Sequence, residues 1–412
     1  MKNNPSRENN RSDFQQKKGN LVTWIVFLFT ISVVLISLTS VVFPALIVSN
    51  VTNVSDLPEL GIYPVKIDPF ESGVWAVPLL VTNLVVLGIA ILYFKKKLPY
   101  LITRSIDFIF SFEISKNAAL VVIVVFLAIY VAASASELAT EDTWFDYAKT
   151  KKKLDSWSIK DVAGGSSQTV RMFLLWSSMI LFGNYKVIPF LASIALLITI
   201  YFITKEITGK RFPGIISMII LLQSNLFLDY DTAVTYTNFW ILFYLLSLYM
   251  VYKIWPLSPI LYLLSIFSKP LTAIFVPMSL FFIYHSRISR RKKIIVAVLI
   301  IVIILVGIIK IQKDLEGFDS DDFWIGFTSF SYQFRFDGLI ILFILPLIAG
   351  LFIASRKGVK QAEAVMFLIG WMLFIAPLLT GFSEMTNQPY RFVPLVVFFA
   401  MGVGTLLSKR KI

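Results

Sequence analysis

The sequence predicts an all-α protein that crosses a membrane many times. Of the 412 residues, 57% are apolar and 15% are charged, whereas a soluble domain rarely exceeds about half apolar residues. The apolar residues gather in blocks long enough to cross a hydrocarbon layer about 30 Å thick. The chain has no cysteine and a single histidine, His285. A soluble enzyme, a disordered chain and a nucleic-acid binder are therefore excluded, and so, in effect, are disulfides and haem, copper or zinc sites.

The chain divides into three parts. We expect residues 1–20 to form a disordered, basic cytoplasmic tail, and residues 21–116 to contain two additional N-terminal transmembrane helices. The first apolar run is too long for a signal-peptide core and indicates a retained signal anchor. Residues 117–412 then form the core, with its largest outer loop at 137–186. The twelve expected spans are 21–49, 74–94, 117–136, 187–203, 212–228, 232–252, 254–268, 270–285, 294–310, 338–354, 361–380 and 391–407.

The short apolar segment 170–182 decides the orientation of everything after it. With 13 residues it is short for a crossing and fits a helix at the interface. If it does not cross, the inner segments hold 25 of the 38 lysines and arginines, as the positive-inside rule requires. Both termini are then cytoplasmic, in a cell membrane of prokaryotic type. The net charge of +13 follows from this topology and needs no nucleic-acid partner.

Polar residues at the outer ends of spans are the candidate functional groups, because unpaired charge near lipid is costly. The large outer loop contains Glu141 and Asp142, with Trp144 and Tyr147 close by. A carboxylate between aromatic rings could accept a proton from a hydroxyl or help to hold a cation, while the rings stack on a sugar. The alternative is a solvated loop with an aromatic belt, which composition alone favours.

The remaining candidates follow later spans. Lys269 precedes a proline inside a long apolar stretch, where it either snorkels to the interface or meets a phosphate. Arg391, next to Tyr390, enters the last span and could anchor a lipid phosphate. The alternative is that both residues belong to the ordinary belt of aromatic and basic side chains at the membrane interface. A second acidic group could come from Asp229 or Asp231, and Arg335 lies near a re-entry point.

Taken in order, these segments resemble the membrane glycosyltransferases of the GT-C fold, which use polyprenyl-phosphate-linked sugars. The family includes protein O-mannosyltransferases, aminoarabinose transferases and oligosaccharyltransferase catalytic subunits. The resemblance covers about residues 117–407. It rests on Glu141-Asp142-Thr143-Trp144-Phe145-Asp146-Tyr147, on the segment 173–183 ending Leu181-Phe182-Gly183, on Ser268-Lys269-Pro270-Leu271-Thr272 and on Tyr390-Arg391-Phe392-Val393-Pro394.

The resemblance implies a GT-C-like core with a juxtamembrane helix, an extracytoplasmic active site and a role for each motif. Asp142 would be the essential acid with Glu141 beside it, and Trp144 and Tyr147 would stack on substrate. Donor phosphate would be held by Lys269, Arg391, Tyr390 and Arg335. No cofactor is certain; a divalent cation, Mg²⁺ or Mn²⁺, is possible, and no metal ligand is identified. Because the chain lacks a Trp-Trp-Asp motif, the resemblance favours transfer of one sugar.

The chain departs from the family pattern at two other places. Asn238 stands where many members carry a second aspartate, and no proline pair opens the segment 170–182. Two other functions compete with the transferase: a carrier or flippase for a lipid-linked substrate, and a non-catalytic membrane subunit. A carrier should have internal repeats and charges in the middle of spans, and neither is found. The expected partners are the polyprenyl-phosphate sugar donor, membrane lipids and an unidentified lipid, glycan or protein acceptor.

Overall fold

The computed structural model describes residues 5–44, 68, 70–142, 146–164, 168–311, 320, 323, 337–380 and 389–408. Within these residues the protein is all-helical, without a strand. Five helices are long and apolar enough to cross a membrane: the apolar part of α1 at Leu21–Val42, α3 (Ala76–Phe94), α5 with its extension at Lys116–Ala139, α9 (Val187–Thr208) and α17 (Gly338–Arg356). The expectation of a helical membrane protein is thereby supported.

The other expected spans also coincide with helices, most of them shorter. Three of them contain a break: residues 212–228 form two helices, and short 3₁₀ segments precede the helices in 270–285 and 391–407. The remaining helices are α10 (Arg211–Leu222), α11 (Asn225–Leu228), α12 (Phe239–Lys253), α13 (Leu257–Ser268), η4 (Pro270–Phe275), α14 (Val276–His285), α15 (Arg290–Ile311), α18 (Lys360–Thr380), η5 (Pro389–Phe392) and α19 (Val393–Leu406).

The structure differs from the sequence analysis in two places. Helix α1 begins at Pro5 and ends at Val42, so residues 5–20, assigned to a disordered tail, are helical. Proline is favoured in the first turn of a helix, and no proline interrupts residues 6–42. The expected inner loop 95–116 contains a further helix, α4 (Tyr100–Ser111), which was not anticipated because its apolar part is too short for a span.

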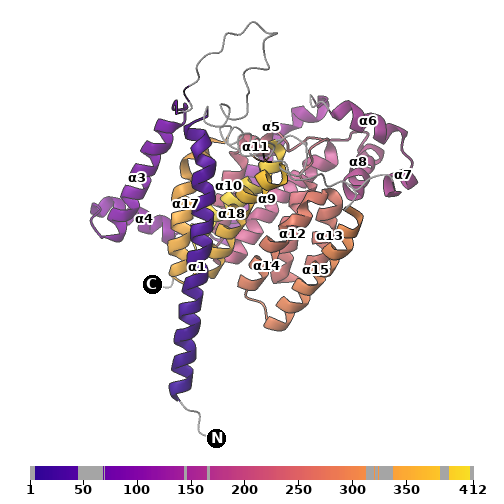
Figure 1. Cartoon of the computed structure of the whole chain (residues 1–412). Helices are drawn as coiled ribbons and strands as arrows, with labels where there is room; N and C mark the ends of the chain where they lie inside the picture. Colours follow the sequence, from indigo (N-terminus) through magenta and orange to yellow (C-terminus); the bar gives the residue numbers. More distant parts are fainter. Residues whose placement is uncertain are drawn as a thin grey trace.

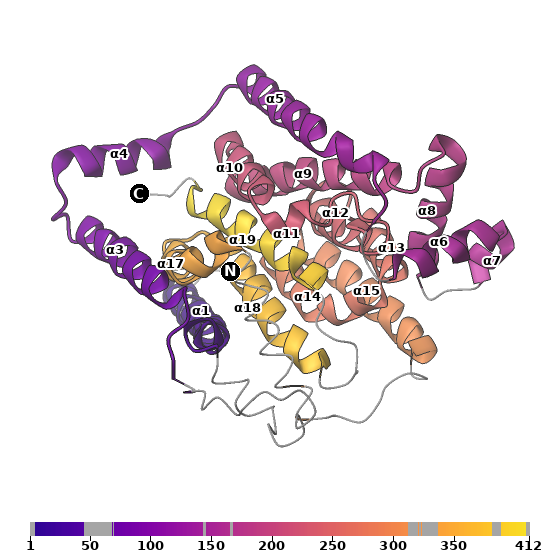
Figure 2. The ribbon, with the colours of Figure 1, turned by 90° about the horizontal axis from the view of Figure 1, so that it is seen from above.

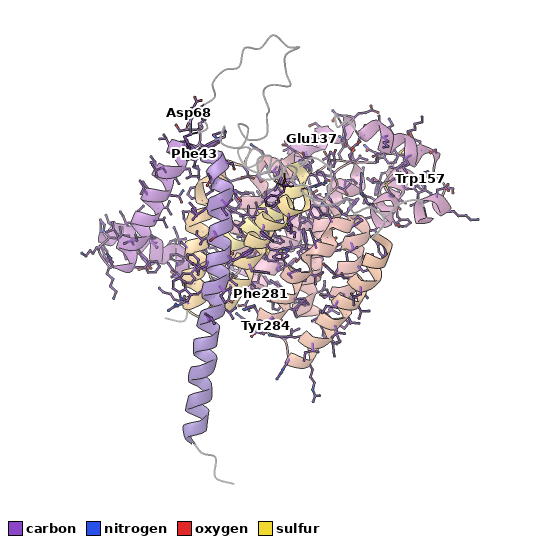
Figure 3. The ribbon with its side chains drawn as sticks, viewed as in Figure 1. Phe43, Asp68, Glu137, Trp157, Phe281 and Tyr284 are labelled. Atoms are coloured by element: carbon purple, nitrogen blue, oxygen red, sulfur yellow. The ribbon has the colours of Figure 1, made fainter. Side chains whose placement is uncertain are left out.

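The loop 137–186, which sequence analysis placed on the outer side and which keeps the name outer loop below, is also mostly helical. It contains η3 (Ala135–Ala139), α6 (Tyr147–Ser156), α7 (Ile159–Gly164) and α8 (Thr169–Phe182). These elements lie together beside one end of the bundle (Figure 1). Figure 3 places Glu137 and Trp157 at that end, and Phe281 and Tyr284 of α14 toward the opposite end. With 14 residues, α8 is shorter than the five helices that are long and apolar enough to cross a membrane, and Figure 2 shows it along its length beside α6 and α7.

The first helix is packed into the core. Phe27 of α1 stacks on Phe352 of α17, with ring centroids 4.3 Å apart, and the Thr30 hydroxyl donates to the Met366 carbonyl of α18. Helix α3 packs on α17 through a narrow face and leaves most of its apolar side chains exposed. Of the two helices that sequence analysis grouped as an N-terminal addition, α1 is therefore an integral part of the bundle.

Close packing around α19 leads to a stability prediction. A Cβ at Gly404 would lie 2.8 Å from the Pro213 carbonyl oxygen of α10 and 2.6 Å from the Thr204 methyl of α9. Because a backbone oxygen cannot rotate away, Gly404→Ala should destabilise the bundle by about 1–3 kcal/mol. The apparent melting temperature in detergent measures this. Gly88→Ala in α3, with nothing within 4 Å, is the matched control; equal melting temperatures for both variants would contradict the packing.

Candidate functional site

The turn between α8 and α9 positions the first group of polar residues. Gly183 ends α8 in the left-handed conformation, with φ of +67°, which glycine adopts without strain. The Ser178 hydroxyl donates to the Asn184 carbonyl (2.6 Å), and the Asn184 amide donates to the Leu138 carbonyl (2.7 Å). These bonds fix the start of α9 against η3. They hold Lys186, the residue before α9, at the outer loop.

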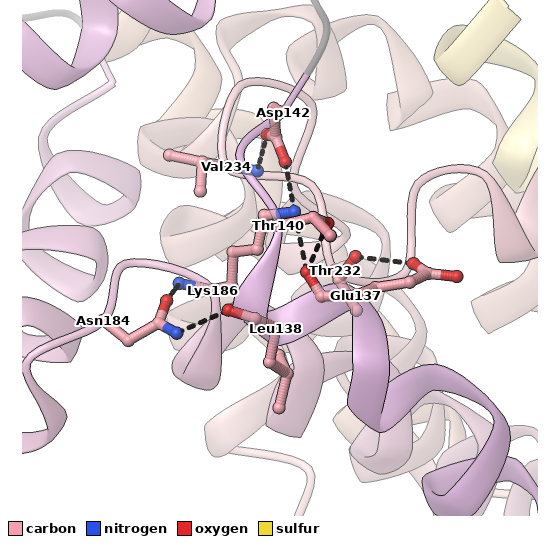
Figure 4. A network of polar contacts seen from close by, with 8 residues as sticks. All are labelled: Glu137, Leu138, Thr140, Asp142, Asn184, Lys186, Thr232 and Val234. Atoms are coloured by element: carbon pink, nitrogen blue, oxygen red, sulfur yellow. Dashed lines mark hydrogen bonds and ion pairs between the residues drawn. The ribbon is translucent and has the colours of Figure 1, made fainter.

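Lys186 forms a buried ion pair with Asp142. Its Nζ lies 2.8 Å from Asp142 Oδ1, and the two side chains are only 7% and 4% exposed. The Val234 backbone N–H donates to Asp142 Oδ2 (2.7 Å), and Lys186 Nζ also donates to the Glu137 carbonyl (3.0 Å). Figure 4 shows this network, in which the Thr232 hydroxyl donates to the Glu137 carboxylate. Asp142, the acid expected from the sequence, is therefore held between the outer loop, α9 and the segment before α12.

The two neighbouring candidates in this loop are more exposed. Glu141 is 71% exposed and pairs with Lys151 at 2.5 Å. With Tyr147 of α6, both line an open surface cavity of about 570 Å³. Tyr147 thus lies on the surface with Glu141 and Lys151, whereas Asp142 is buried. Trp144 lies outside the described residues.

Lys269 lies at the break between α13 and η4. Its extended backbone precedes Pro270, which disfavours helical conformation in the residue before it. The Lys269 Nζ is buried, without a hydrogen-bond partner in the described part of the chain. It faces the Tyr390 ring at 3.6 Å and the Trp240 ring at 4.7 Å. Burial lowers the pKa of Lys269 well below its ordinary value, and the charges of Arg391 and Arg171 lower it further.

Arg171 of α8 belongs to the same cluster, although sequence analysis did not single it out. Its guanidinium donates to Gln168 Oε1 (2.5 Å) and to the Val234 carbonyl (3.3 Å), and its buried Nε has no partner among the described residues. The Val234 peptide thus contacts Asp142 through its N–H and Arg171 through its C=O. The sequence does contain a signal that could have identified Arg171, namely a charged residue in the first turn of a short apolar helix.

Arg391 and Tyr390, both in η5, complete the arrangement. Tyr390 stacks on Tyr236 with ring centroids 4.3 Å apart, and the Tyr236 hydroxyl donates weakly to Asp146 (3.4 Å). The Nε of Arg391 is buried without a described partner. Arg171 and Arg391 lie near Lys269, since their charges lower its pKa, and the three residues are together called the cation cluster. Arg335, the third cation expected from the sequence, lies outside the described residues.

The two candidate second acids differ in environment. Asp231 is buried, accepts a hydrogen bond from the Ser134 hydroxyl (2.9 Å), and has no partner in the described structure for its Oδ1 atom. Burial raises the pKa of Asp231 to about 6, opposed by hydrogen bonds to the carboxylate. Asp229, at the end of α11, is exposed. Asp231 is therefore the one held inside the protein.

The arrangement combines three cations, whose Lys269 Nζ and arginine Nε atoms are buried without a hydrogen-bond partner among the described residues, with the Asp142 carboxylate, which shares the Val234 peptide with Arg171. Buried charges are normally paired, because an unpaired ion in a low-dielectric site is costly. A cation cluster with free N–H groups is consequently suited to bind an anion such as a phosphate. Among the described residues, no group of three or more His, Cys, Asp or Glu side chains could hold a metal ion.

The comparisons with known proteins add no assignment. No family model, no curated protein and no solved structure matches this chain.

Proposed function

We propose that the protein is a GT-C-type glycosyltransferase with twelve membrane crossings and both termini in the cytoplasm. It would move one sugar from a polyprenyl-phosphate donor to a lipid, glycan or protein acceptor on the extracytoplasmic side. The observation that carries the proposal is the cation cluster beside the loop that contains Asp142: the Lys269 Nζ and the Nε atoms of Arg171 and Arg391 are buried without partners within the described structure. The order of the sequence motifs supports the same activity.

In the proposed reaction the bond between the sugar's anomeric carbon and the phosphate oxygen breaks, and a bond to the acceptor oxygen forms. The electron pair leaves with the lipid phosphate, whose added negative charge Lys269, Arg171 and Arg391 would stabilise. The proton of the acceptor hydroxyl would pass to Asp142. A carboxylate offers about four acceptor sites, so its bonds to Lys186 and Val234 leave room for a hydroxyl.

The decisive experiment offers purified protein a panel of lipid-linked monosaccharides and measures release of polyprenyl phosphate. We expect release with one donor class and a fall of about 10²-fold or more in Lys269→Gln, the magnitude typical of losing one transition-state charge stabiliser. Lys253→Gln is the matched control, since Lys253 ends α12 and pairs with Glu206 on the surface. Equal activity of both variants would remove Lys269 from the mechanism, and transport of an unaltered donor would favour a carrier.

A further inference from the structure

Helix α4 presents an apolar surface that no described element covers. Its polar residues Thr103, Arg104 and Asp107 lie on one side, since they are spaced by one turn. The opposite side carries Ile102 and Ile109, which are 45% and 47% exposed, and the flank between the two sides carries Leu101 and Phe108, which are 76% and 61% exposed. No residue of α4 is buried. Figure 2 shows the helix along its length while α1 is seen end-on.

This exposure occurs in a helix that is well attached. The Tyr93 hydroxyl of α3 donates to Asp107 (2.5 Å), and the Lys210 ammonium donates to the Phe110 carbonyl (2.6 Å). Beyond α4, Phe112 packs edge-on against Phe212 of α10, with ring centroids 4.8 Å apart. The C-terminal half of α4 is thus tied to α3 and to the start of α10, so its apolar side is presented in a defined direction.

A run of three lysines, Lys95, Lys96 and Lys97, connects α3 to α4. Lys96 has a φ of +54°, in a helix-ending turn closed by a hydrogen bond from the Lys97 N–H to the Leu92 carbonyl (2.9 Å). Glycine is the residue that adopts this conformation without strain, so a positive charge occupies a strained position. Within the described residues, no carboxylate lies at ion-pair distance from these three lysines.

Further basic residues lie against α3 and α4. The Lys357 ammonium, just beyond α17, lies 4.5 Å from the ring centroid of Phe94, the last residue of α3. At the start of α10, Lys210 donates to the Phe110 carbonyl of α4, and Arg211 pairs with Glu113 just after α4. Basic residues therefore border α4, most of all Lys95, Lys96 and Lys97. Its chemical complement is an apolar layer with an anionic rim.

We propose that α4 and Lys95, Lys96 and Lys97 form a binding surface for anionic phospholipid. The helix would lie in the plane of the leaflet, with Ile102 and Ile109 among the acyl chains and the lysines at the headgroup phosphates. Neither α3 nor α4 contributes a residue to the cation cluster, so the surface stands apart from the proposed sugar transfer.

Lipid retention tests the charge component. The full-length protein is purified from mixed phosphatidylglycerol and phosphatidylcholine, and bound lipids are counted by native mass spectrometry. We expect a preference for phosphatidylglycerol that falls about tenfold or more when Lys95, Lys96 and Lys97 are replaced by glutamine. The matched control replaces three other consecutive lysines by glutamine: Lys151, Lys152 and Lys153 of α6, in the loop 137–186. Equal losses in both variants, or no preference in the parent protein, would overturn the proposal.

Spin labelling tests the placement of the helix. Because the chain contains no cysteine, Ile109→Cys and Arg104→Cys can each be labelled alone in phosphatidylglycerol-containing nanodiscs. We expect the label at 109 to be accessible to oxygen, which dissolves in acyl chains, and the label at 104 to be accessible to a water-soluble nickel complex. If the label at 109 is the more accessible to nickel, α4 faces water or a soluble partner and the lipid surface is disproved.

Discussion

Asp142→Asn is expected to destabilise the protein strongly, apart from any effect on catalysis. The substitution removes the carboxylate partner of Lys186, whose side chain is only 7% exposed, and leaves the Glu137 carbonyl as the one partner of its ammonium among the described residues. Breaking one side of a buried ion pair typically costs about 3–5 kcal/mol, because the remaining charge is uncompensated. The apparent melting temperature in detergent should therefore fall clearly. Loss of sugar transfer in this variant alone could not distinguish a catalytic role from a structural one.

Two further variants separate these roles. Glu141→Gln is the matched control at the adjacent residue, since its exposed pair with Lys151 should contribute about 1 kcal/mol or less. The double variant Asp142→Asn with Lys186→Met removes both buried charges and should recover much of the lost stability. If Asp142 accepts the acceptor's proton, the double variant stays inactive although it is folded. Recovery of sugar transfer would show that Asp142 only holds the loop in place.

Lys269→Met is expected to have the opposite effect on stability. The Lys269 ammonium is buried without a described partner, so its removal should raise the melting temperature of the ligand-free protein. The same variant should lose the stabilisation that added polyprenyl phosphate gives, which for one site is about 2.7 kcal/mol at a hundredfold excess over Kd. Lys186→Met is the matched control, because it removes a buried lysine that has a carboxylate partner and should destabilise the protein.

The pH dependence of stability offers a second measurement on Lys269. Its pKa is lowered in the folded protein by burial and by the charges of Arg391 and Arg171, whereas an unfolded lysine has a pKa of about 10.4. Between these values the unfolded chain binds more protons, so this contribution to stability rises with pH. The melting temperature of the parent protein should thus carry a rising component toward alkaline pH that Lys269→Met lacks. Identical pH profiles for the parent protein and Lys269→Met would contradict a lowered pKa of Lys269.

Much of the architecture could be predicted from the sequence because apolar periodicity is a local property. The long helices α9 and α17 and the short helix α8 lie where the apolar runs place them. Helix α4 was missed, since a short amphipathic segment gives no span signal, and residues 5–20 extend α1 although their composition is polar. Asp142, Lys269 and Arg391 stood out because charge at the end of an apolar span is unusual.

The sequence by itself determined that this is a helical membrane protein and which charged residues border its apolar segments. Only the tertiary structure decided how those charges are matched: Lys186 meets Asp142, Arg171 joins Lys269 and Arg391, and the Val234 peptide links the two groups. The physical reason is that hydropathy acts between a residue and its surroundings, whereas pairing requires two particular groups within about 3 Å. Whether distant groups come that close depends on how the ends of α8, α9, α12 and η5 pack, which no local pattern specifies.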